Sequence, residues 1–218
     1  MRQQRNMSGL LVESALIVFS VLFALFIDRA TEKAKTGRQK RVALERMQHE
    51  LLANHQLLTN VLVRHRRVVS NLNRVLGNER DSLRIKLLQK GYIDFMLLSD
   101  GQSIYPRLPT GTSWEAALST GIVAELDYGV VEALTLVYSS QEFITGKTFQ
   151  NIVDDLYDVE AASPERKLLK LKLEFEELIA QEVSLQERIG AALKRMQKLY
   201  NLPLPPGTPA ARAGKTGP

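Results

Sequence analysis

The sequence predicts an all-α protein whose first helix spans a membrane. Three observations lead to this fold class: an apolar run from Leu10 to Ile27, a seven-residue repeat of apolar residues after it, and a second such repeat late in the chain. Apolar residues that recur every 3.5 positions are typical of long helices packed along a seam. We therefore expect an amino-terminal transmembrane helix that continues into a long helix, which pairs antiparallel with a long carboxyl-terminal helix, with shorter helices between.

The apolar run has the length of a membrane span. At 1.5 Å per residue, its 18 residues cover roughly 27 Å, close to the ~30 Å hydrocarbon core of a bilayer. Its 13 strongly apolar residues favour insertion by on the order of 6 kcal/mol, whereas Glu13, near the edge, costs less than the about 3 kcal/mol of a central acid. We predict the transmembrane helix at 10–28, after a short polar tail at 1–9.

A cleaved signal peptide is the alternative for this run. Signal peptides have apolar cores of about 7–15 residues, followed by small residues at the cleavage site. Here the run ends in Phe26-Ile27-Asp28-Arg29, which lacks small residues at the required positions. A retained anchor is therefore favoured over a signal peptide.

Basic residues are more frequent after the run than before it, where only Arg2 and Arg5 stand. The positive-inside rule keeps the richer flank in the cytoplasm, so the large domain is expected there, although long domains can translocate regardless of charge. We expect the basic residues that follow the span either to contact acidic lipid headgroups or to form a solvated helix face. They are Arg29, Lys33, Lys35, Arg38, Lys40 and Arg41.

Composition restricts the chemistry of the chain. The protein has 218 residues, a net charge of +5 and no cysteine. Disulfides, thiolate metal sites and cysteine nucleophiles are thereby excluded. After the anchor, enough residues remain for one helical domain, which we place at 29–200.

The first long helix is predicted to continue from Arg29 to about Leu76, because this stretch contains no proline and only one glycine, Gly37. Gly77-Asn78 should end it, since glycine is common just after a helix. Its heptad core positions are Leu44, Met47, Leu51, Asn54, Leu58, Val61, His65, Val68, Leu72 and Val75. Asn54 and His65 fill the two polar core positions.

Shorter elements are expected in the middle of the chain. A helix is predicted from Asp81 to Ser99, and its apolar face is Leu83, Leu87, Leu88, Phe95 and Leu98. A loop with two glycines and two prolines follows at 100–113. Thr112-Ser-Trp-Glu115 then matches a capping box, which predicts a helix with Trp114 in its first turn.

Gly121 and Gly129 are expected to break the next stretch into short helical pieces. Another helix is predicted from Val130 to Asp158. Its candidate buried residues are Leu134, Val137, Tyr138, Phe149, Val153 and Leu156.

Ser163-Pro164 predicts the start of the last long helix, with serine as N-cap and proline in the first turn. Its heptad positions are Leu168, Leu171, Phe175, Leu178, Glu182, Leu185, Ile189, Ala192, Met196 and Leu199. Both heptad stripes need cover, which antiparallel pairing of the two long helices supplies; pairing between two copies of the chain is the alternative. The Pro-, Gly- and Ala-rich residues 201–218 are predicted to be disordered.

Several stretches resemble a family of uncharacterised bacterial single-pass membrane proteins. They are Leu22-Phe-Ala-Leu-Phe-Ile-Asp-Arg29, Leu44-Glu-x-Met-x-x-Glu-Leu-Leu-x-Asn54, Ser113-Trp-Glu-Ala-Ala-Leu-Ser-Thr-Gly121 and the step Leu134–Tyr138. The resemblance covers about residues 12–157. It implies an amino-terminal anchor in the bacterial inner membrane and a helical domain of unknown function, and it carries no catalytic or ligand residues.

Three residues in the span are candidates for function. Glu13 could bind or relay protons, although from the edge of the span it can also reach the headgroups, and this structural role is favoured. Ser20 and Ala24 lie on the stripe that runs from Glu13, and small residues at this spacing would let two anchors pack closely.

Other motifs are better explained as structure. Glu45, His49, Glu50 and His55 share a helix face at metal-ligand spacing. They lack the paired Glu-x-x-His motifs of di-iron bundles, so a solvated face is favoured. His65 occupies a core position, where a hydrogen-bonded histidine is favoured over a ligand.

Two phosphate-binding interpretations are also set aside. Gly146-Lys147-Thr148 ends like a phosphate-binding loop, but Gln141 stands where that motif needs glycine. Arg64-His-Arg-Arg67 with Arg74 has no interleaved aromatic residues and fits a charged helix face better than a nucleic-acid site. We expect no metal, cofactor or nucleic acid.

A pocket, if one exists, is expected where 105–114 meets 121–128, because breaks between helices create concavities. Its candidate lining residues are Tyr105, Trp114 and Tyr128, which could equally pack the core. The function predicted from these observations is a non-enzymatic, membrane-anchored helical scaffold that binds a protein partner or a second copy of itself. The alternative is an accessory subunit of an ion- or proton-coupled membrane complex that uses Glu13.

Overall fold

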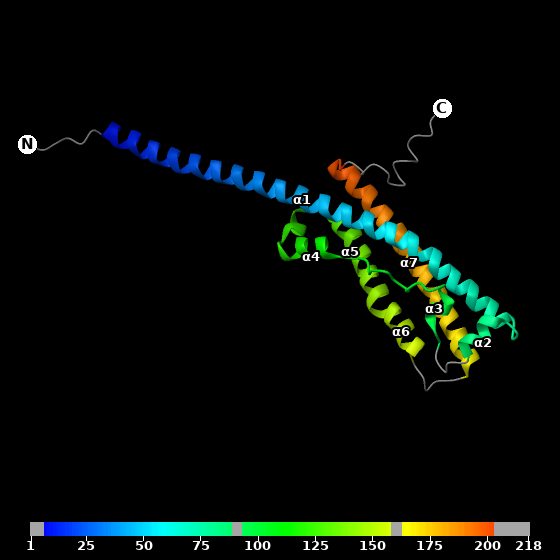
Figure 1. Cartoon of the computed structure of the whole chain (residues 1–218). Coiled ribbons are helices and arrows are strands. Elements are labelled where there is room, and N and C mark those ends of the chain that lie inside the picture. Colours follow the sequence, from blue (N-terminus) through cyan, green and yellow to red (C-terminus); the bar gives the residue numbers. More distant parts are fainter. Residues whose placement is uncertain (1–6, 89–92, 158–162, 203–218) are drawn as a thin grey trace, which may run out of the picture. The chain divides into compact units, whose positions relative to one another are not determined.

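The computed structural model describes residues 7–88, 93–157 and 163–202, and the side chains of 12–87, 93–157 and 163–202. Within these ranges every regular element is a helix, which confirms the predicted all-α class (Figure 1). The chain divides into two units between Ala43 and Leu44. The helices are α1 (Met7–Gly77), α2 (Ser82–Leu88), α3 (Phe95–Leu98), α4 (Thr112–Ser119), the 3₁₀ helix η1 (Ile122–Glu125), α5 (Tyr128–Phe143), the π-helix η2 (Ile144–Thr148), α6 (Phe149–Tyr157) and α7 (Pro164–Tyr200).

The first unit consists of α1 up to Ala43. Helix begins at Met7, three residues before the predicted span, and residues 1–6 lie outside the described ranges. Between residues 12 and 27, large apolar side chains lie on all sides of this helix. Those between Val12 and Ile27 are 50–70 % exposed, and the most apolar 18-residue window is 0 % buried. This helix is long and apolar enough to cross a membrane.

In the second unit, the rest of α1 follows the predicted heptad. All ten predicted core positions between Leu44 and Val75 are at most 3 % exposed, Asn54 and His65 included. The helix ends at Gly77, as predicted. Burying a polar side chain is unfavourable unless it forms hydrogen bonds. Asn54 and His65 therefore need partners inside the core.

Helix α7 packs antiparallel to this part of α1 (Figure 1). Gln186 of α7 donates to Thr59 of α1 at 2.8 Å, whereas Glu182, one turn earlier on α7, meets His65, further along α1. Rising numbers on one helix therefore match falling numbers on the other. The predicted antiparallel pair is confirmed.

Nine of the ten predicted core positions of α7 are buried, and the tenth, Leu199, is wrong at 48 % exposed. A straight helix drifts about 20° per heptad from a 3.5-residue repeat. The seam moves accordingly: Leu193 is buried beside Ala192, and the half-buried Tyr200 takes the last position.

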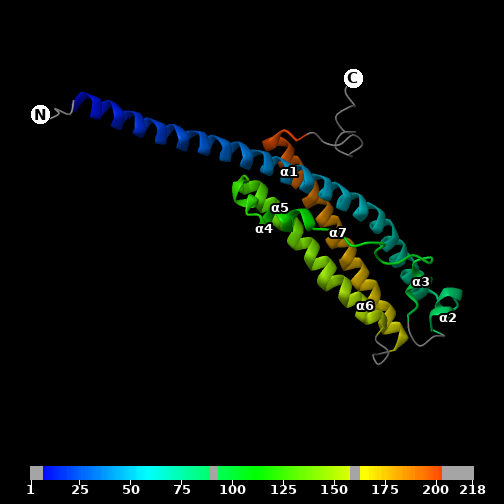
Figure 2. The ribbon, with the colours of Figure 1, turned by 60° about the vertical axis from the view of Figure 1, so that its left-hand side comes forward.

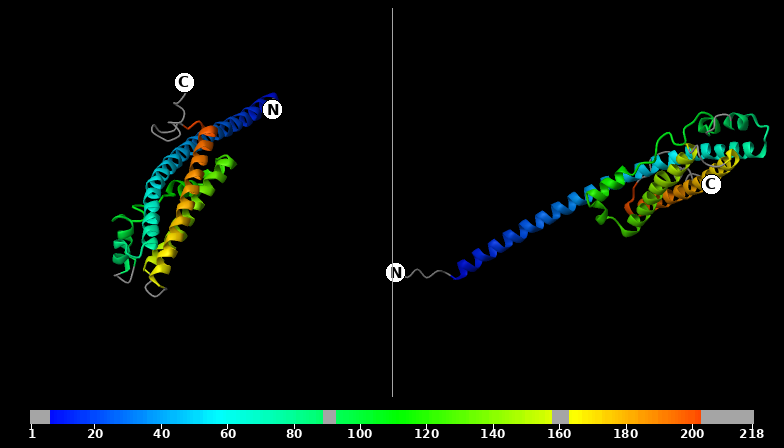
Figure 3. Two further views of the ribbon diagram at one scale, coloured as in Figure 1. Left: turned by 90° about the vertical axis from the view of Figure 1, so that its right-hand side faces the viewer. Right: turned by 90° about the horizontal axis from the view of Figure 1, so that it is seen from below.

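A third rod of helix lies along α7 and is built from α5, η2 and α6 (Figures 2 and 3). Arg188 of α7 donates to Ser140 at 2.8 Å, and Lys170, earlier on α7, donates to Asp155 at 2.7 Å, so this rod is also antiparallel to α7. The core is therefore a three-helix arrangement of α1, α7 and the rod.

The predicted helix Val130–Asp158 is corrected in two ways. It begins earlier, at Tyr128, because the Asp127 side chain accepts from Gly129 N at 2.9 Å and caps it, so Gly129 does not break the chain. The π-helical turn η2 then shifts the register of the buried face. Phe149 and Val153 are consequently half-buried, and the residues buried from η2 onwards are Ile144, Thr148, Ile152 and Leu156.

The predicted single helix Asp81–Ser99 is wrong. The structure has two short helices, α2 and α3, each opened by an aspartate: Asp81 accepts from Leu83 N at 2.8 Å and Asp94 from Met96 N at 3.1 Å. Local side-chain acceptors of this kind start new helices. Gly91 and the side chain of Leu88 lie outside the described residues.

The end of α7 is capped by Asn201 in the left-handed conformation, with φ of 48°. Leu202 is only 3 % exposed, so the packed unit extends two residues past the predicted boundary at 200. Positions 203–218 of the predicted disordered tail lie outside the described residues.

Candidate functional site

The predicted membrane-facing residues all lie on the first unit. Glu13, Ser20 and Ala24 are exposed, and the Ser20 hydroxyl donates to the Leu16 carbonyl at 2.8 Å. That bond satisfies the hydroxyl within its own helix, as an apolar environment requires. Of the six basic residues after the span, Lys40 is half-buried and the other five are exposed.

The most enclosed polar cluster lies in the second unit. We call it the buried triad: His65 of α1, Tyr105 of the segment after α3, and Glu182 of α7. His65 Nδ1 lies 3.0 Å from Glu182 Oε2, and the Tyr105 hydroxyl donates to Glu182 Oε1. His65 and Glu182 are 0 % exposed and Tyr105 is 9 % exposed, so three separate segments meet away from solvent.

The proton positions in the buried triad follow from its partners. His65 Nε2 lies 3.1 Å from the carbonyl oxygen of Ile104, which can only accept, so Nε2 carries a proton. Nδ1 then either donates to a Glu182 carboxylate or accepts from a protonated Glu182. Both arrangements hold the same number of protons and leave the pair neutral overall, which avoids the cost of an isolated buried charge.

Tyr105 stays protonated in this setting. Burial raises the pKa of its phenol well above the ordinary value, and the charge of Glu182 and the hydrogen bond to it raise the pKa further. Its ring also meets Phe149 of α6 edge-on at 5.5 Å. Tyr105 thus joins the segment after α3 to α7 and α6.

The segment from Leu98 to Ser113 runs along α1 in the opposite direction. Asn71 donates to the Leu98 carbonyl at 2.8 Å, and at the far end Asn54 donates to the Thr110 carbonyl at 2.7 Å and accepts from Thr110 N at 3.1 Å. Asn54 also donates to Gln141 of α5 at 2.9 Å. The polar heptad position Asn54 therefore holds a loop and a third helix against α1.

Glu50, one turn before Asn54, caps α4. Its carboxylate accepts from Ser113 N at 2.9 Å and from the Tyr138 hydroxyl at 2.8 Å. The predicted Thr112–Glu115 capping box is therefore wrong: the residue before α4 is Gly111, and it provides no side-chain cap. A carboxylate near the first turn also interacts favourably with the helix dipole.

Trp114 lies in the first turn of α4, as predicted, and stacks on Tyr138 with ring centroids 5.5 Å apart. Burial raises the pKa of Tyr138 well above its ordinary value, and Glu50 raises it further. The three residues predicted to line one pocket occupy different surroundings. Tyr105 belongs to the buried triad, Trp114 stacks on Tyr138, and Tyr128 is 81 % exposed.

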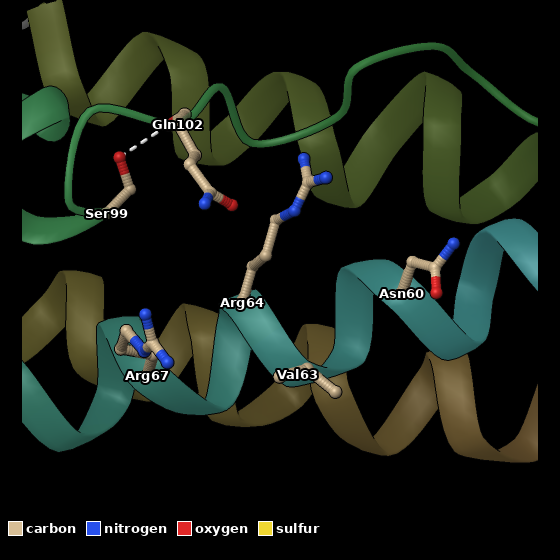
Figure 4. A pocket seen from close by; sticks show the side chains of 6 residues that line it. All are labelled: Asn60, Val63, Arg64, Arg67, Ser99 and Gln102. Carbon is tan, nitrogen blue, oxygen red and sulfur yellow. Dashed lines mark hydrogen bonds between the residues drawn. The ribbon is translucent and has the colours of Figure 1, made fainter.

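The structure instead has a hollow of about 340 Å³ between α1 and the start of the Leu98–Ser113 segment (Figure 4). Its lining residues are Asn60, Val63, Arg64, Arg67, Ser99 and Gln102. Sequence reasoning placed the two arginines on a solvated face and missed the hollow. The spacing of Asn60, Arg64 and Arg67, which puts three polar side chains on one side of a helix, is the sequence feature that could have indicated it.

A pair of acids joins α6 to α7. Asp155 and Glu174 are hydrogen-bonded through their side chains, and Lys170 lies 2.6 Å from Asp155 Oδ2. Burial and then Asp155 raise the pKa of Glu174 to about 8, while the hydrogen bond from Glu174 and then Lys170 lower the pKa of Asp155. Burial and Asp155 both favour the protonated form of Glu174, which can donate to Asp155.

Other motifs considered from the sequence have structural partners. Within the described ranges, no group of three or more His, Cys, Asp or Glu side chains is arranged to hold a metal ion. Gly146-Lys147-Thr148 forms part of η2, where Thr148 donates to Gln181 at 2.8 Å.

Comparisons with family models, with curated proteins and with solved structures found no match for this chain.

Proposed function

We propose that this protein is a non-enzymatic, membrane-anchored helical scaffold. In this proposal residues 12–27 lie in the bilayer, and the unit from Leu44 to Leu202 holds a partner protein beside it. The bacterial inner membrane is the proposed location, with the helical unit on the cytoplasmic side.

One observation carries the anchor: the apolar window near the amino end is 0 % buried. The core helix of a soluble protein would be covered by the rest of the chain, whereas here eleven large apolar side chains from Val12 to Ile27 are at least half exposed. Leaving so much apolar area in water is unfavourable, at about 25 cal/mol per Å². Lipid is the cover that suits a helix apolar on all sides.

The scaffold role is supported by how the polar core residues are used. The buried triad, Asn54 and Glu50 each join segments that are distant in the sequence. Each hydrogen-bonds to neighbouring elements, as expected of residues that specify one packing arrangement. In this proposal they shape a surface for a partner.

Carbonate washing of membranes from cells that express the full chain tests the anchor. The protein should stay in the pellet and dissolve only with detergent. In the variant Phe19→Arg/Leu22→Arg, each central arginine costs roughly 3 kcal/mol and deletes a favourable contribution of about 0.5 kcal/mol. Together they offset the ~6 kcal/mol that favours insertion, so this variant should move to the supernatant.

A matched control adds the same charge elsewhere. Leu118→Arg/Leu169→Arg replaces two exposed leucines of the second unit and should remain in the pellet. Intact-mass measurement separates a retained anchor from a cleaved signal sequence. Wild-type protein in the carbonate supernatant would contradict the anchor.

The scaffold half of the proposal has its own test. Crosslinking in intact membranes, followed by purification in detergent and light scattering, should give a mass above that of the monomer. Recovery as a monomer, with and without crosslinking, would count against a scaffold while leaving the anchor intact.

A further inference from the structure

The hollow beside α1 contains a guanidinium group that has no partner among the described residues. Arg64 is half-buried, and it makes no hydrogen bond or ion pair with any residue that the structure describes. In Figure 4 its side chain extends from α1 towards the segment that carries Gln102. An arginine that is partly removed from water and unpaired is an unfavourable arrangement, which an anion would relieve.

The positive charge of the hollow is only partly balanced. Arg67, three residues from Arg64 on the same helix face, pairs with Asp100 at 3.3 Å, and both side chains of that pair are more than half exposed. Two arginines therefore face one carboxylate in this neighbourhood. The remaining charge lies on Arg64, where it is least exposed to solvent.

Two amide side chains also line the hollow, Asn60 and Gln102. Asn60 lies one turn before Arg64, and its side-chain oxygen accepts from Gln56 at 3.4 Å. Its NH₂ group therefore remains available to donate. The side-chain amide of Gln102 has no hydrogen bond to a described residue, while its backbone carbonyl accepts from the buried Ser99 hydroxyl and is thereby held in place. A guanidinium fork with two amide groups suits the oxygens of a phosphate or carboxylate.

We propose that this hollow binds a compact oxyanion, a phosphate or carboxylate group, through Arg64 with help from Arg67, Asn60 and Gln102. The volume of about 340 Å³ lies at the small end of ligand sites, which fits a single anionic group with a short organic part. Such a group belongs either to a soluble metabolite or to a lipid headgroup. The site lies wholly in the second unit and does not depend on the membrane proposal.

Calorimetric titration of the full chain in a zwitterionic detergent tests this site. The two probes are inorganic phosphate and a short-chain phosphatidylglycerol. Saturable binding of phosphate identifies a soluble anion as the ligand, and binding of the lipid alone identifies a headgroup. Arg64→Gln should raise the Kd of the probe that binds at least tenfold, and Arg67→Gln should raise it by less.

Arg66→Gln is the matched control, since Arg66 is an exposed neighbour outside the hollow, and its Kd should stay within about twofold of the wild type. Arg64→Lys provides a second variant that keeps the charge but loses the fork, and it should bind more weakly than wild type at an unchanged unfolding temperature. Absence of saturable binding to both probes would overturn the site. Equal effects of Arg64→Gln and Arg66→Gln would overturn it as well, because they would show attraction by net charge alone.

Discussion

His65 Nδ1 on α1 lies 3.0 Å from Glu182 Oε2 on α7, and both side chains are completely buried. Each occupies a heptad core position: Glu182 is the only polar core position of α7, and His65 is one of two on α1, together with Asn54. An antiparallel pairing in another register would place His65 against apolar side chains, because α7 has no other polar core position. The contact therefore selects one register of the two long helices, as single buried polar residues do in coiled coils.

Substitutions at Glu182 should separate hydrogen bonding from charge. Glu182→Leu leaves His65 Nδ1 and the Tyr105 hydroxyl without a partner and should lower the free energy of unfolding by about 3–5 kcal/mol. Glu182→Gln offers a donor to neutral His65 and an acceptor to Tyr105, so it should cost less than about 1.5 kcal/mol. Urea unfolding in neutral detergent, followed by the fluorescence of the single tryptophan, measures both.

The exposed Glu187→Gln on the same helix is the control and should change stability by no more than about 0.5 kcal/mol. Equal losses for Glu182→Leu and Glu182→Gln would show that charge, rather than hydrogen bonding, dominates the buried triad.

Glu174 should make stability depend on pH. Its pKa in the folded protein is about 8, above the 4.5 of the unfolded chain, so the folded state holds more protons between these values. The contribution of Glu174 to stability is therefore present below about pH 4.5 and is lost as pH rises towards about 8. Glu174→Gln still donates to Asp155 but cannot ionise, so its urea midpoint should fall less between about pH 5 and about pH 8.5.

Asp155 acts in the opposite direction at low pH. Its pKa is lowered from 3.8, so its contribution is lost as pH falls below that value, outside the window of the Glu174 measurement. Glu187→Gln should keep the wild-type pH profile. A Glu174→Gln profile that overlays the wild type would contradict the raised pKa of Glu174.

Two substitutions distinguish the Glu50 cap of α4 from the Thr112–Glu115 capping box that the sequence predicts. Glu50→Ala removes the acceptor for Ser113 N and for Tyr138, and should cost about 1–2 kcal/mol and speed hydrogen exchange in α4. Glu115→Ala, which a capping box would make the sensitive variant, should cost less than about 1 kcal/mol, because Glu115 is exposed and acts only through the helix dipole. A larger loss of stability for Glu115→Ala than for Glu50→Ala would support the capping box instead.

The absence of native cysteine allows a direct measurement of orientation. Glu79→Cys places a thiol just after α1 in the second unit, and Ser8→Cys places one before the span. With the basic flank inside the cell, a membrane-impermeant maleimide should label Ser8→Cys on spheroplasts and Glu79→Cys only after permeabilisation. The cysteine-free parent is the blank, and the opposite labelling pattern would place the helical unit outside.

The heptads alone identified most of the buried residues of α1 and α7. All ten predicted positions of α1 and nine of α7 are buried. A long helix on the surface of a bundle buries one stripe of side chains, and the spacing of its apolar residues shows which stripe that is. The exception, Leu199, follows from the drift of a straight helix away from a seven-residue repeat. Spacing also marked His65, Asn54 and Glu182 as core residues.

Spacing could not say what those polar residues touch. Tyr105 reaches Glu182 across 77 positions, and Glu50 caps a helix that begins 62 residues later, so neither contact leaves a local pattern. The split of the predicted 81–99 helix and the π turn at 144–148 likewise depend on how each segment packs.

By itself, the sequence determined that this chain is helical, that its first helix has the length and apolarity of a membrane span, and which stripes are buried. Periodicity and hydrophobicity are local properties, so they can be obtained from the order of residues. Only the tertiary structure decided the register of the helices, the course of the Leu98–Ser113 segment and the hollow around Arg64. Those features arise from pairs of groups that the chain brings together only when it folds, since a hydrogen bond or an unpaired charge is defined by its surroundings.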